Sequence, residues 1–396
     1  MILTEGQEKL LKKISTWYND VRNGNTADYK HPQWFAYSGA AGVGKTAVIK
    51  EFLNELHLHE TYIGCAYTGK AVLNMQMNGL KARTIHSLIY NVIDVEKYNP
   101  ETGQHYYGPE FVLKDELDYD YSLIIVDEAP MVNDEMCGEI LSFGIPVVFI
   151  GDMNQLPPVF GKSSVMQNPD HVLTQIMRQR EDDPIVQLSQ MVLKGLPIFE
   201  GEYGKCSVVR SHEVTIDDMT NYDQILCITN KLRAKINSFM REERYGTEKT
   251  FRPQLLDKVV CRQNNWDISH NGFFLTNGTA GIITDIDRST VARGYYLIDF
   301  HPDYFKRGED FERLKVDCNY INSDWKVQRA TQMISNEKFE YAYALTVHLS
   351  QGSEYNRVLF FDSYFRDPET TRKAEYTAIT RAKELITIVR DPNLLM

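Results

Sequence analysis

The first residues that suggest chemistry form a glycine-rich run ending in lysine and threonine. The run is Gly39, Ala40, Ala41, Gly42, Val43, Gly44, Lys45 and Thr46, with Ala47 directly behind it. It follows an apolar segment and opens a helical pattern over Thr46–Leu56. In that context the glycines let backbone N–H groups converge on phosphate oxygens, and the helix N-terminus favours the same anion. We expect Lys45 to contact the β- and γ-phosphates of ATP and Thr46 to ligate Mg²⁺.

A pair of carboxylates follows a second apolar segment. Leu123–Val126 ends directly before Asp127 and Glu128. A buried strand would deliver Asp127 to the metal, and Glu128 would orient and deprotonate the attacking water. Asp-Glu after an apolar run is common by chance, so the combination with the glycine-rich run carries the prediction of a nucleoside triphosphatase. These residues leave open what work the hydrolysis does.

The elements around these residues alternate between short apolar runs and helical patterns. Trp34–Ser38, Tyr62–Tyr67 and Val147–Ile150 are further apolar runs, typical of strands buried on both faces of a parallel sheet. Lys70–Asn78 supplies a second helical crossover. The predicted fold class is therefore α/β, with a first domain over residues 1–91 and 119–182.

One insertion interrupts this first domain. Ile93–Tyr98 and His105–Val112 flank a turn that contains Pro and Gly, which predicts a β-hairpin within residues 92–118. The hairpin is either an ordinary surface element or a wedge that separates strands. Its aromatic residues are the candidates for stacking on bases: Tyr106, Tyr107 and Phe111.

A second α/β pattern occupies residues 183–254 and 336–396, behind an acidic linker at residues 181–184. Its expected core strands are Ile225–Thr229, Val358–Phe361 and Ile386–Val389. Residues 255–335 differ, with short strand-like runs and a strong turn signal at Asn277-Gly278, between Phe273–Leu275 and Gly281–Ile283. We expect a small β-barrel-like insertion there.

Composition excludes several classes of protein. The six cysteines form no Cys-x-x-Cys pair, so neither a zinc site nor a disulfide framework is expected. We expect buried, reduced thiols instead. No apolar stretch approaches the roughly 20 residues of a membrane span, and the start of the chain lacks the pattern of a signal peptide. We expect a cytoplasmic protein of a bacterial cell or a phage-infected host. The net charge of −11 gives no support for nucleic-acid binding, which has to come from motifs.

Further segments of the first domain resemble, in order, the motifs of superfamily one helicases, above all the Dda and RecD branch. Leu3–Gln7 is similar to the adenine-reading segment, Tyr67–Ala71 and Thr84–Leu88 to DNA-contacting motifs, and Gly151–Pro158 to a segment that senses the γ-phosphate. By this resemblance Gln7 contacts the base and Gln155 the γ-phosphate. The DNA contacts that it implies are Thr68, Gly69, Lys70, Thr84 and His86.

The second α/β pattern carries the rest of the resemblance. Tyr343–Glu354 is similar to the fifth motif, which implies that Thr346 and His348 face DNA and that Glu354 faces the ribose. Arg178 resembles the arginine of the fourth motif, and Arg381 resembles the arginine finger of the sixth. The sequence departs from the family at Pro130, where Ser is usual, and at Tyr67, where Pro is frequent.

The resemblance spans residues 3–383 and implies two RecA-like motor domains with an SH3-like accessory insertion at 255–335. It implies an ATP-dependent DNA helicase that moves 5′-to-3′ on single-stranded DNA and unwinds forked or tailed duplexes. Replication or repair proteins, such as a single-strand-binding protein or a polymerase, are possible partners, and a monomer is expected. Two alternatives remain: a translocase that displaces bound proteins with little unwinding, and a binding module switched by nucleotide.

Overall fold

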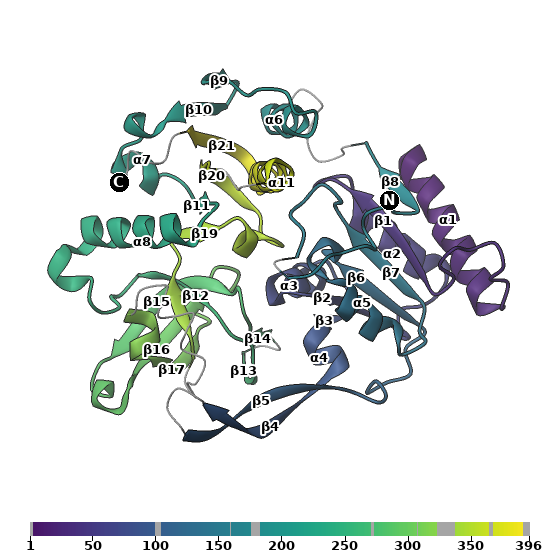
Figure 1. The fold of residues 1–396 in the computed structure, drawn as a ribbon, viewed down its shortest axis with the longest axis horizontal. Coiled ribbons are helices and arrows are strands. Elements are labelled where there is room, and N and C mark those ends of the chain that lie inside the picture. Colours follow the sequence, from purple (N-terminus) through teal and green to yellow (C-terminus); the bar gives the residue numbers. More distant parts are fainter. Residues whose placement is uncertain are drawn as a thin grey trace. The chain divides into compact units, whose positions relative to one another are not determined.

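The computed structural model describes residues 3–99, 104–158, 160–175, 183–270, 273–306, 308–322, 337–363 and 367–390. The chain divides into two compact units, Met1–Arg180 and Glu181–Met396 (Figure 1). In the described ranges, no helix has the length and apolar character needed to cross a membrane. All six cysteines are buried and unpaired, as expected.

The first unit is built on a six-stranded sheet of order β3-β2-β6-β7-β1-β8, in which the paired strands run parallel. Its strands are β1 (Trp34–Gly39), β2 (Tyr62–Ala66), β3 (Ala82–Thr84), β6 (Leu123–Asp127), β7 (Val147–Gly151) and β8 (His171–Leu173). The helical elements are α1 (Glu5–Arg22), α2 (Lys45–Glu55), α3 (Gly69–Met77), α4 (Ile85–Ile89), η1 (Ala129–Met131) and α5 (Asp134–Leu141). Because the interior strands are apolar on both faces, helices cover both, and the predicted α/β class is confirmed.

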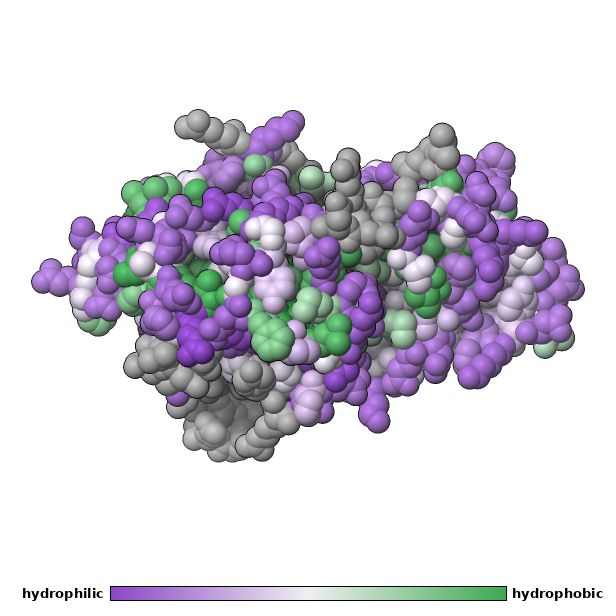
Figure 2. Space-filling model, turned by 90° about the horizontal axis from the view of Figure 1, so that it is seen from above, coloured by the Kyte–Doolittle hydropathy of each residue, from purple (hydrophilic) through white to green (hydrophobic). Residues whose placement is uncertain are grey.

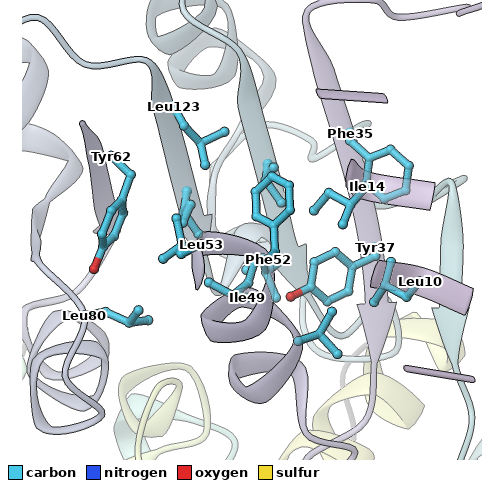
Figure 3. Close-up of a cluster of buried hydrophobic side chains, with 14 of the residues drawn as sticks. Leu10, Ile14, Phe35, Tyr37, Ile49, Phe52, Leu53, Tyr62, Leu80 and Leu123 are labelled. Atoms are coloured by element: carbon cyan, nitrogen blue, oxygen red, sulfur yellow. The ribbon is translucent and has the colours of Figure 1, made fainter. Parts of the chain in front are cut away.

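Two hydrophobic clusters flank this sheet. On the α1 and α2 side, Phe52 and Ile49 of α2 pack with Leu10 and Ile14 of α1 against Tyr37 of β1 (Figure 3). The other face carries a second cluster that includes Ile85 of α4 and Ile140 of α5. The glycine-rich loop thus lies between two elements, β1 and α2, that both contribute buried side chains to this cluster.

The inserted hairpin consists of β4 (Tyr90–Asn99) and β5 (Gln104–Leu113), paired antiparallel over ten residue pairs. It starts two residues earlier than expected, directly after α4. Residues 100–103, which hold most of the predicted turn, and the side chains of Tyr106 and Tyr107 lie outside the described residues.

The second unit contains a six-stranded sheet of order β19-β11-β20-β21-β10-β9. Its strands are β9 (Gly201–Tyr203), β10 (Cys206–Arg210), β11 (Gln224–Cys227), β19 (Ala344–Thr346), β20 (Tyr355–Phe361) and β21 (Ala382–Arg390). Only the β9–β10 pair is antiparallel among the described pairs of this sheet. Its helical elements are α6 (Pro184–Leu193), η2 (Ser211–Glu213), α7 (Ile216–Thr220), α8 (Asn230–Tyr245), η3 (Thr247–Lys249), η5 (His348–Ser350) and α11 (Pro368–Ile379). We call this six-stranded sheet the motor sheet of the second unit.

A smaller antiparallel sheet of order β17-β16-β15-β12-β18 belongs to the same unit. It is made of β12 (Lys258–Cys261), β15 (Ala280–Asp287), β16 (Tyr295–Pro302), β17 (Phe311–Asp317) and β18 (Phe339–Tyr341), and it is accompanied by β13 (Asn265–His270), β14 (Phe273–Leu275), η4 (Val291–Arg293) and α9 (Cys318–Asn322). A parallel bridge between Val316 and Glu337 links the β17 edge to the segment before β18. The bridge gives the sheet a nearly closed form, and we call it the small sheet.

Two expectations about this unit are wrong in detail, whereas the turn expected at Asn277-Gly278 is present. The strands on either side of that turn do not pair with each other, because β14 pairs with β13 while β15 pairs with β12 and β16. A type I′ hairpin turn needs positive φ at both central residues, and here Gly278 has it (φ +89°) while Asn277 does not. β18 lies in the small sheet, so this sheet extends past residue 335. Asp183 and Pro184 cap and open α6 and are not part of a linker, and residues 181 and 182 lie outside the described ranges.

Hydrophilic residues cover most of the face shown in Figure 2, and the hydrophobic residues there form separate patches. The apolar side chains of the sheets are instead gathered in the buried clusters. Stability of each unit is therefore expected to depend on these clusters.

We predict that Phe52→Ala lowers the free energy of unfolding of the first unit by about 3–5 kcal/mol, because a fully buried aromatic side chain is lost and leaves a cavity. Hydrogen exchange of α2 and β1 peptides, followed by mass spectrometry, measures the change. The matched control is Met77→Ala in the same unit, whose side chain is 69% exposed and whose loss should cost about 0.5 kcal/mol or less. Equal protection in the two variants would contradict the packing described here.

Candidate functional site

The glycine-rich loop links the end of β1 to the start of α2, as the sequence predicts. Gly42 and Gly44 both have φ +81°, in the left-handed region where glycine is favoured. An added Cβ at Gly44 would lie 2.4 Å from Nε2 of Gln7. The backbone conformation of Gly44 therefore favours glycine, and a side chain there would also displace the end of Gln7.

Gln7 is buried beside this loop. Its Oε1 accepts a hydrogen bond from Thr4 N (2.9 Å) and its Nε2 donates to Val43 O (2.9 Å). Together with the bond from Gln7 N to Thr4 Oγ1, this forms a capping box that starts α1. The structure therefore brings Gln7 to the phosphate-binding loop, where the resemblance had given it only a contact with the base.

Lys45 lies folded over the loop. Its Nζ donates to Gly39 O (2.7 Å) and Ala40 O (3.1 Å), and Tyr37 Oη donates to Lys45 O (3.0 Å). These carbonyls hold the ammonium group at the mouth of the loop. The charge is thereby positioned where phosphate oxygens would meet the loop's N–H groups.

Asp127 ends β6, and its carboxylate accepts a hydrogen bond from Glu128 N (2.9 Å). The pKa of Asp127 is raised to about 6, first by loss of solvation and second by the neighbouring Glu128 carboxylate, while Lys45 and the Glu128 N–H oppose the rise. A half-buried carboxylate beside another carboxylate favours a bound cation. With the hydroxyl of Thr46 at the start of α2, it offers the oxygen ligands that Mg²⁺ prefers.

Glu128 has a left-handed backbone (φ 51°, ψ 42°), which is rare for a residue with a side chain. Such a conformation costs on the order of 1–3 kcal/mol and is maintained only where the surroundings impose it. Here Glu128 turns the chain from β6 into η1, and it is one of four non-glycine residues with positive φ in the described ranges. Backbone strain at an acidic residue beside a phosphate loop is typical of a catalytic position.

The end of β7 supplies the third part of the site. Ser38 Oγ accepts a hydrogen bond from Met153 N (3.0 Å), which ties the segment after β7 to β1. Gln155 is buried, and its Oε1 has no hydrogen-bond partner within the described chain. An added Cβ at Gly151 would lie 2.3 Å from Cδ of Pro130. The ring of this unusual proline thus fills the space that a side chain at position 151 would need.

The first unit thus brings together the residues predicted for nucleotide binding. β1, β6 and β7 are parallel and near neighbours in one sheet, so Gly39, Asp127 and Gly151 end at the same edge. Ligands of open α/β sheets bind beyond that edge. Ser38 and Tyr37 are contributors that the sequence analysis missed, because nothing in a serine or tyrosine within an apolar strand marks the long-range hydrogen bonds that it makes.

The predicted DNA contacts of the first unit lie at the starts of two helices. Thr68 caps α3, where its Oγ1 accepts from Ala71 N (3.3 Å), and Thr84 caps α4, where its Oγ1 accepts from Ser87 N (3.3 Å). Gly69 and Lys70 open α3. Both hydroxyls are therefore used for helix capping, directly after the ends of β2 and β3.

His86 is the centre of an aromatic cluster. Its ring lies 5.5 Å from Tyr67, 5.6 Å from Tyr90 and 5.4 Å from Phe111, measured between ring centroids. Burial lowers the pKa of His86, and its Nδ1 has no hydrogen-bond partner in the described part of the chain. Tyr67 and Phe111 remain 39% and 48% exposed. The cluster joins the hairpin to the predicted DNA-contacting segments, a link that the sequence did not reveal.

In the second unit the predicted residues lie around β19 and η5. Thr346 Oγ1 accepts from Leu349 N (3.4 Å), and burial lowers the pKa of His348. Glu354 pairs with Lys383 (3.2 Å between Oε2 and Nζ). Arg178 lies outside the described residues.

Arg381 is 3% exposed, and its guanidinium donates to Ser353 O (3.1 Å) and Thr377 O (3.2 Å). Both partners are backbone carbonyls, and among the described residues no carboxylate forms an ion pair with it. The guanidinium charge is thus fixed in place and not neutralised. Nor does the described part of the chain contain a group of three or more His, Cys, Asp or Glu residues that could hold a metal.

Comparison with known proteins identifies two family matches. The AAA domain family matches residues 27–205, and the UvrD-like helicase C-terminal domain family matches residues 341–389. The ATP-dependent RecD2 DNA helicase of Deinococcus radiodurans is 25% identical over 382 residues, which cover 88% of this chain and 45% of that protein. An uncharacterised protein of Methanocaldococcus jannaschii is 23% identical and is covered to 36%. The chain thus spans less than half the length of these relatives.

Solved structures of similar fold are Pif1 helicases. A structure of two coordinating Pif1 helicases at forked double-stranded DNA has a TM-score of 0.58 at 19% identity, with 98% of this chain and 92% of that chain covered. Bacteroides Pif1 bound to single-stranded DNA has a TM-score of 0.56 at 18% identity with the same coverage. Candida albicans Pif1 has a TM-score of 0.53 at 17% identity, with 100% and 97% covered. These likenesses support the fold of two RecA-like domains.

The family matches at both ends of the chain agree with the RecD2 relative and with the helicase motifs that the sequence carries in order. The chain is thus similar to the AAA domain family over residues 27–205, to the UvrD-like helicase C-terminal domain family over residues 341–389, and to a RecD2 helicase across most of its length.

Proposed function

We propose that this chain is an ATP-driven motor that moves along single-stranded DNA and unwinds duplex DNA. The observation that carries the proposal is the edge of the first sheet, where the Lys45 loop, the paired acids Asp127 and Glu128, and Gln155 follow three neighbouring strands. Phosphoryl transfer needs positioning and charge stabilisation, and these are the groups that provide them.

Each residue has a part in the proposed hydrolysis. Lys45 and the loop N–H groups hold the phosphates, and Thr46 with Asp127 would hold Mg²⁺, which neutralises the developing charge. Glu128 orients the attacking water and takes its proton. The unpaired Oε1 of Gln155 suits a contact with that water or the γ-phosphate. Arg381 is the second unit's candidate for the cation that stabilises the transition state.

Binding of a nucleic-acid strand is supported by a different set of features. The helix N-termini at Thr68 and Thr84 offer N–H groups to the phosphates of a nucleic-acid backbone. The partly exposed rings of Tyr67 and Phe111 offer surfaces on which bases could stack. Relatives named as helicases, and solved Pif1 structures with single-stranded or forked DNA, support DNA as the ligand. A translocase that strips proteins from a strand would use the same residues. The two activities are separated by comparing duplex unwinding with the displacement of streptavidin from a biotinylated strand.

The first prediction concerns ATP turnover. Lys45→Ala should lower the DNA-stimulated rate at least 100-fold, because the loss of one preorganised cation at a transferring phosphoryl group costs about that much. Lys50→Ala, on the same helix but away from the loop, should leave the rate within twofold. A Lys45→Ala variant that still hydrolyses ATP at the normal rate would remove the basis of the proposed motor.

A second prediction concerns direction. The resemblance implies 5′-to-3′ movement, so strand displacement should occur on duplexes with a single-stranded 5′ tail and be absent on those with only a 3′ tail. The measurement is gel-resolved displacement on two substrates of equal length and sequence. Unwinding confined to 3′-tailed duplexes would reverse the assigned polarity without affecting the proposed ATPase.

A third prediction concerns the hairpin, which we propose as the element that separates the strands. Phe111→Ala should reduce unwinding severalfold while leaving ATP turnover on single-stranded DNA within twofold, because an aromatic face at the base of the hairpin is lost. Val112→Ala is the control, since its side chain is also exposed but points to the opposite face of the same strand. Equal effects on unwinding would argue against this role.

A further inference from the structure

The second unit contains a crossover that passes directly from one sheet into the other. β18 (Phe339–Tyr341) pairs with β12 of the small sheet, and β19 (Ala344–Thr346) pairs with β11 of the motor sheet. Only Ala342 and Tyr343 separate the two strands. In Figure 1 this yellow-green segment rises from the small sheet past α8 to β19. Thr346 and His348, the proposed strand contacts, follow it immediately.

The main chain of the crossover is held by two buried amide side chains. Asn237 of α8 donates from Nδ2 to Tyr341 O (2.9 Å) and Ala344 O (3.2 Å), and its Oδ1 accepts from Ala344 N (2.7 Å). Gln224 of β11 donates from Nε2 to Ala342 O and Tyr343 O, each at 3.1 Å. With Ala342 N bound to Lys258 O (2.8 Å), nearly every polar group of this peptide stretch is accounted for.

Asn237 belongs to a polar stripe along one side of α8. Arg233, Asn237 and Arg241 are spaced four residues apart and are all buried, whereas the adjacent stripe of Leu232, Ile236 and Met240 packs into the core of the motor sheet. Arg233 binds Glu340 of β18. Arg241 binds Asp257 through both carboxylate oxygens (3.0 and 3.1 Å), and Asp257 also accepts from Tyr343 Oη. Burying an asparagine lowers the stability of a fold unless its amide is hydrogen-bonded. Here both ends of the Asn237 amide have hydrogen-bond partners.

The consequence is a fixed register. A strand that slips by one residue turns every side chain to the opposite face. Asn237 binds both the N–H and the C=O of Ala344, and a slip by one residue would turn these two groups away from it. Thr346 lies two residues farther on, on the same face of β19, so the bonds to Ala344 also set the side of the sheet on which Thr346 lies.

We propose that Asn237 and Gln224 are positioning residues that hold the crossover, and through it Thr346 and His348, in the arrangement that contacts a nucleic-acid strand. The assignment rests on the proposed function. The two residues touch neither nucleotide nor strand, and they act through the main chain of residues 341–344.

The test is a double-mutant cycle read out by nucleic-acid activation. The quantity measured is the concentration of oligothymidine that gives half-maximal stimulation of ATP turnover by the full chain. Asn237→Ala and Thr346→Ala should each raise it about tenfold, with the maximal rate and the turnover without DNA unchanged in Asn237→Ala. Because both changes disturb one contact, the double variant should also show about a tenfold rise, and not the roughly 100-fold rise expected for independent sites.

Met240→Ala is the matched control. It shortens a buried side chain one turn along α8 and lowers the melting temperature, but it removes no hydrogen bond from the crossover. It should leave the half-activating concentration within twofold. Gln224→Ala should behave like Asn237→Ala, and it decides the question in the same cycle if Asn237→Ala does not fold.

A multiplicative double variant, or an equal rise in Met240→Ala, would overturn the positioning role while leaving the proposed motor intact. If oligothymidine does not stimulate the unmodified chain at all, the proposed function fails first and this assignment fails with it. The two failures are therefore distinguished by the behaviour of the unmodified protein.

Discussion

The candidate site of the first unit depends on holding a carboxylate at the half-buried end of β6, where its negative charge is disfavoured. The pKa of Asp127 is raised to about 6, and loss of solvation followed by the Glu128 carboxylate causes this rise. What opposes it is local: the ammonium group of Lys45 and the N–H of Glu128. Both groups lie near the carboxylate because the chain turns sharply beside it, at the glycines after β1 and at Glu128 with its left-handed backbone. The parallel sheet brings these turns to a common edge, and the apolar clusters on its two faces hold that edge rigid.

The parts of this site that follow from local sequence were predictable. The glycine-rich loop, its helix and the strand before Asp127 are each encoded by neighbouring residues, and all three lie where the pattern places them. Contacts made across the fold were not predictable. Nothing near Gln7 in the sequence indicates its bond to Val43, and nothing near Pro130 indicates that its ring occupies the space a side chain at Gly151 would need. These are outcomes of packing between segments far apart in the chain.

Strand partners have the same origin in long-range packing. The turn predicted at Asn277-Gly278 is present, but the partners of the strands on either side of it are determined by the whole sheet. The end of the small insertion was misplaced for a related reason, since β18 is three residues long and resembles the start of the motor strand that follows it. The polar stripe of α8 gave no sequence signal at all. Arginine and asparagine at four-residue spacing usually indicate an exposed face, and only the buried partners Asp257, Glu340 and Ala344 reveal otherwise.

Both ends of the small sheet are anchored on that one helix. The chain enters it at Asp257, which is held by Arg241, and leaves it through Tyr341 and Ala344, which are held by Asn237. Among the described strands, β15, β16 and β17 project from this double anchorage and pair with one another and with β12, and β17 also forms the bridge to Glu337. Such a design separates what must stay constant from what is free to vary. The outer loops of the small sheet can therefore differ in length or be exchanged between proteins. The two attachments to α8 would leave the rest of the unit unchanged.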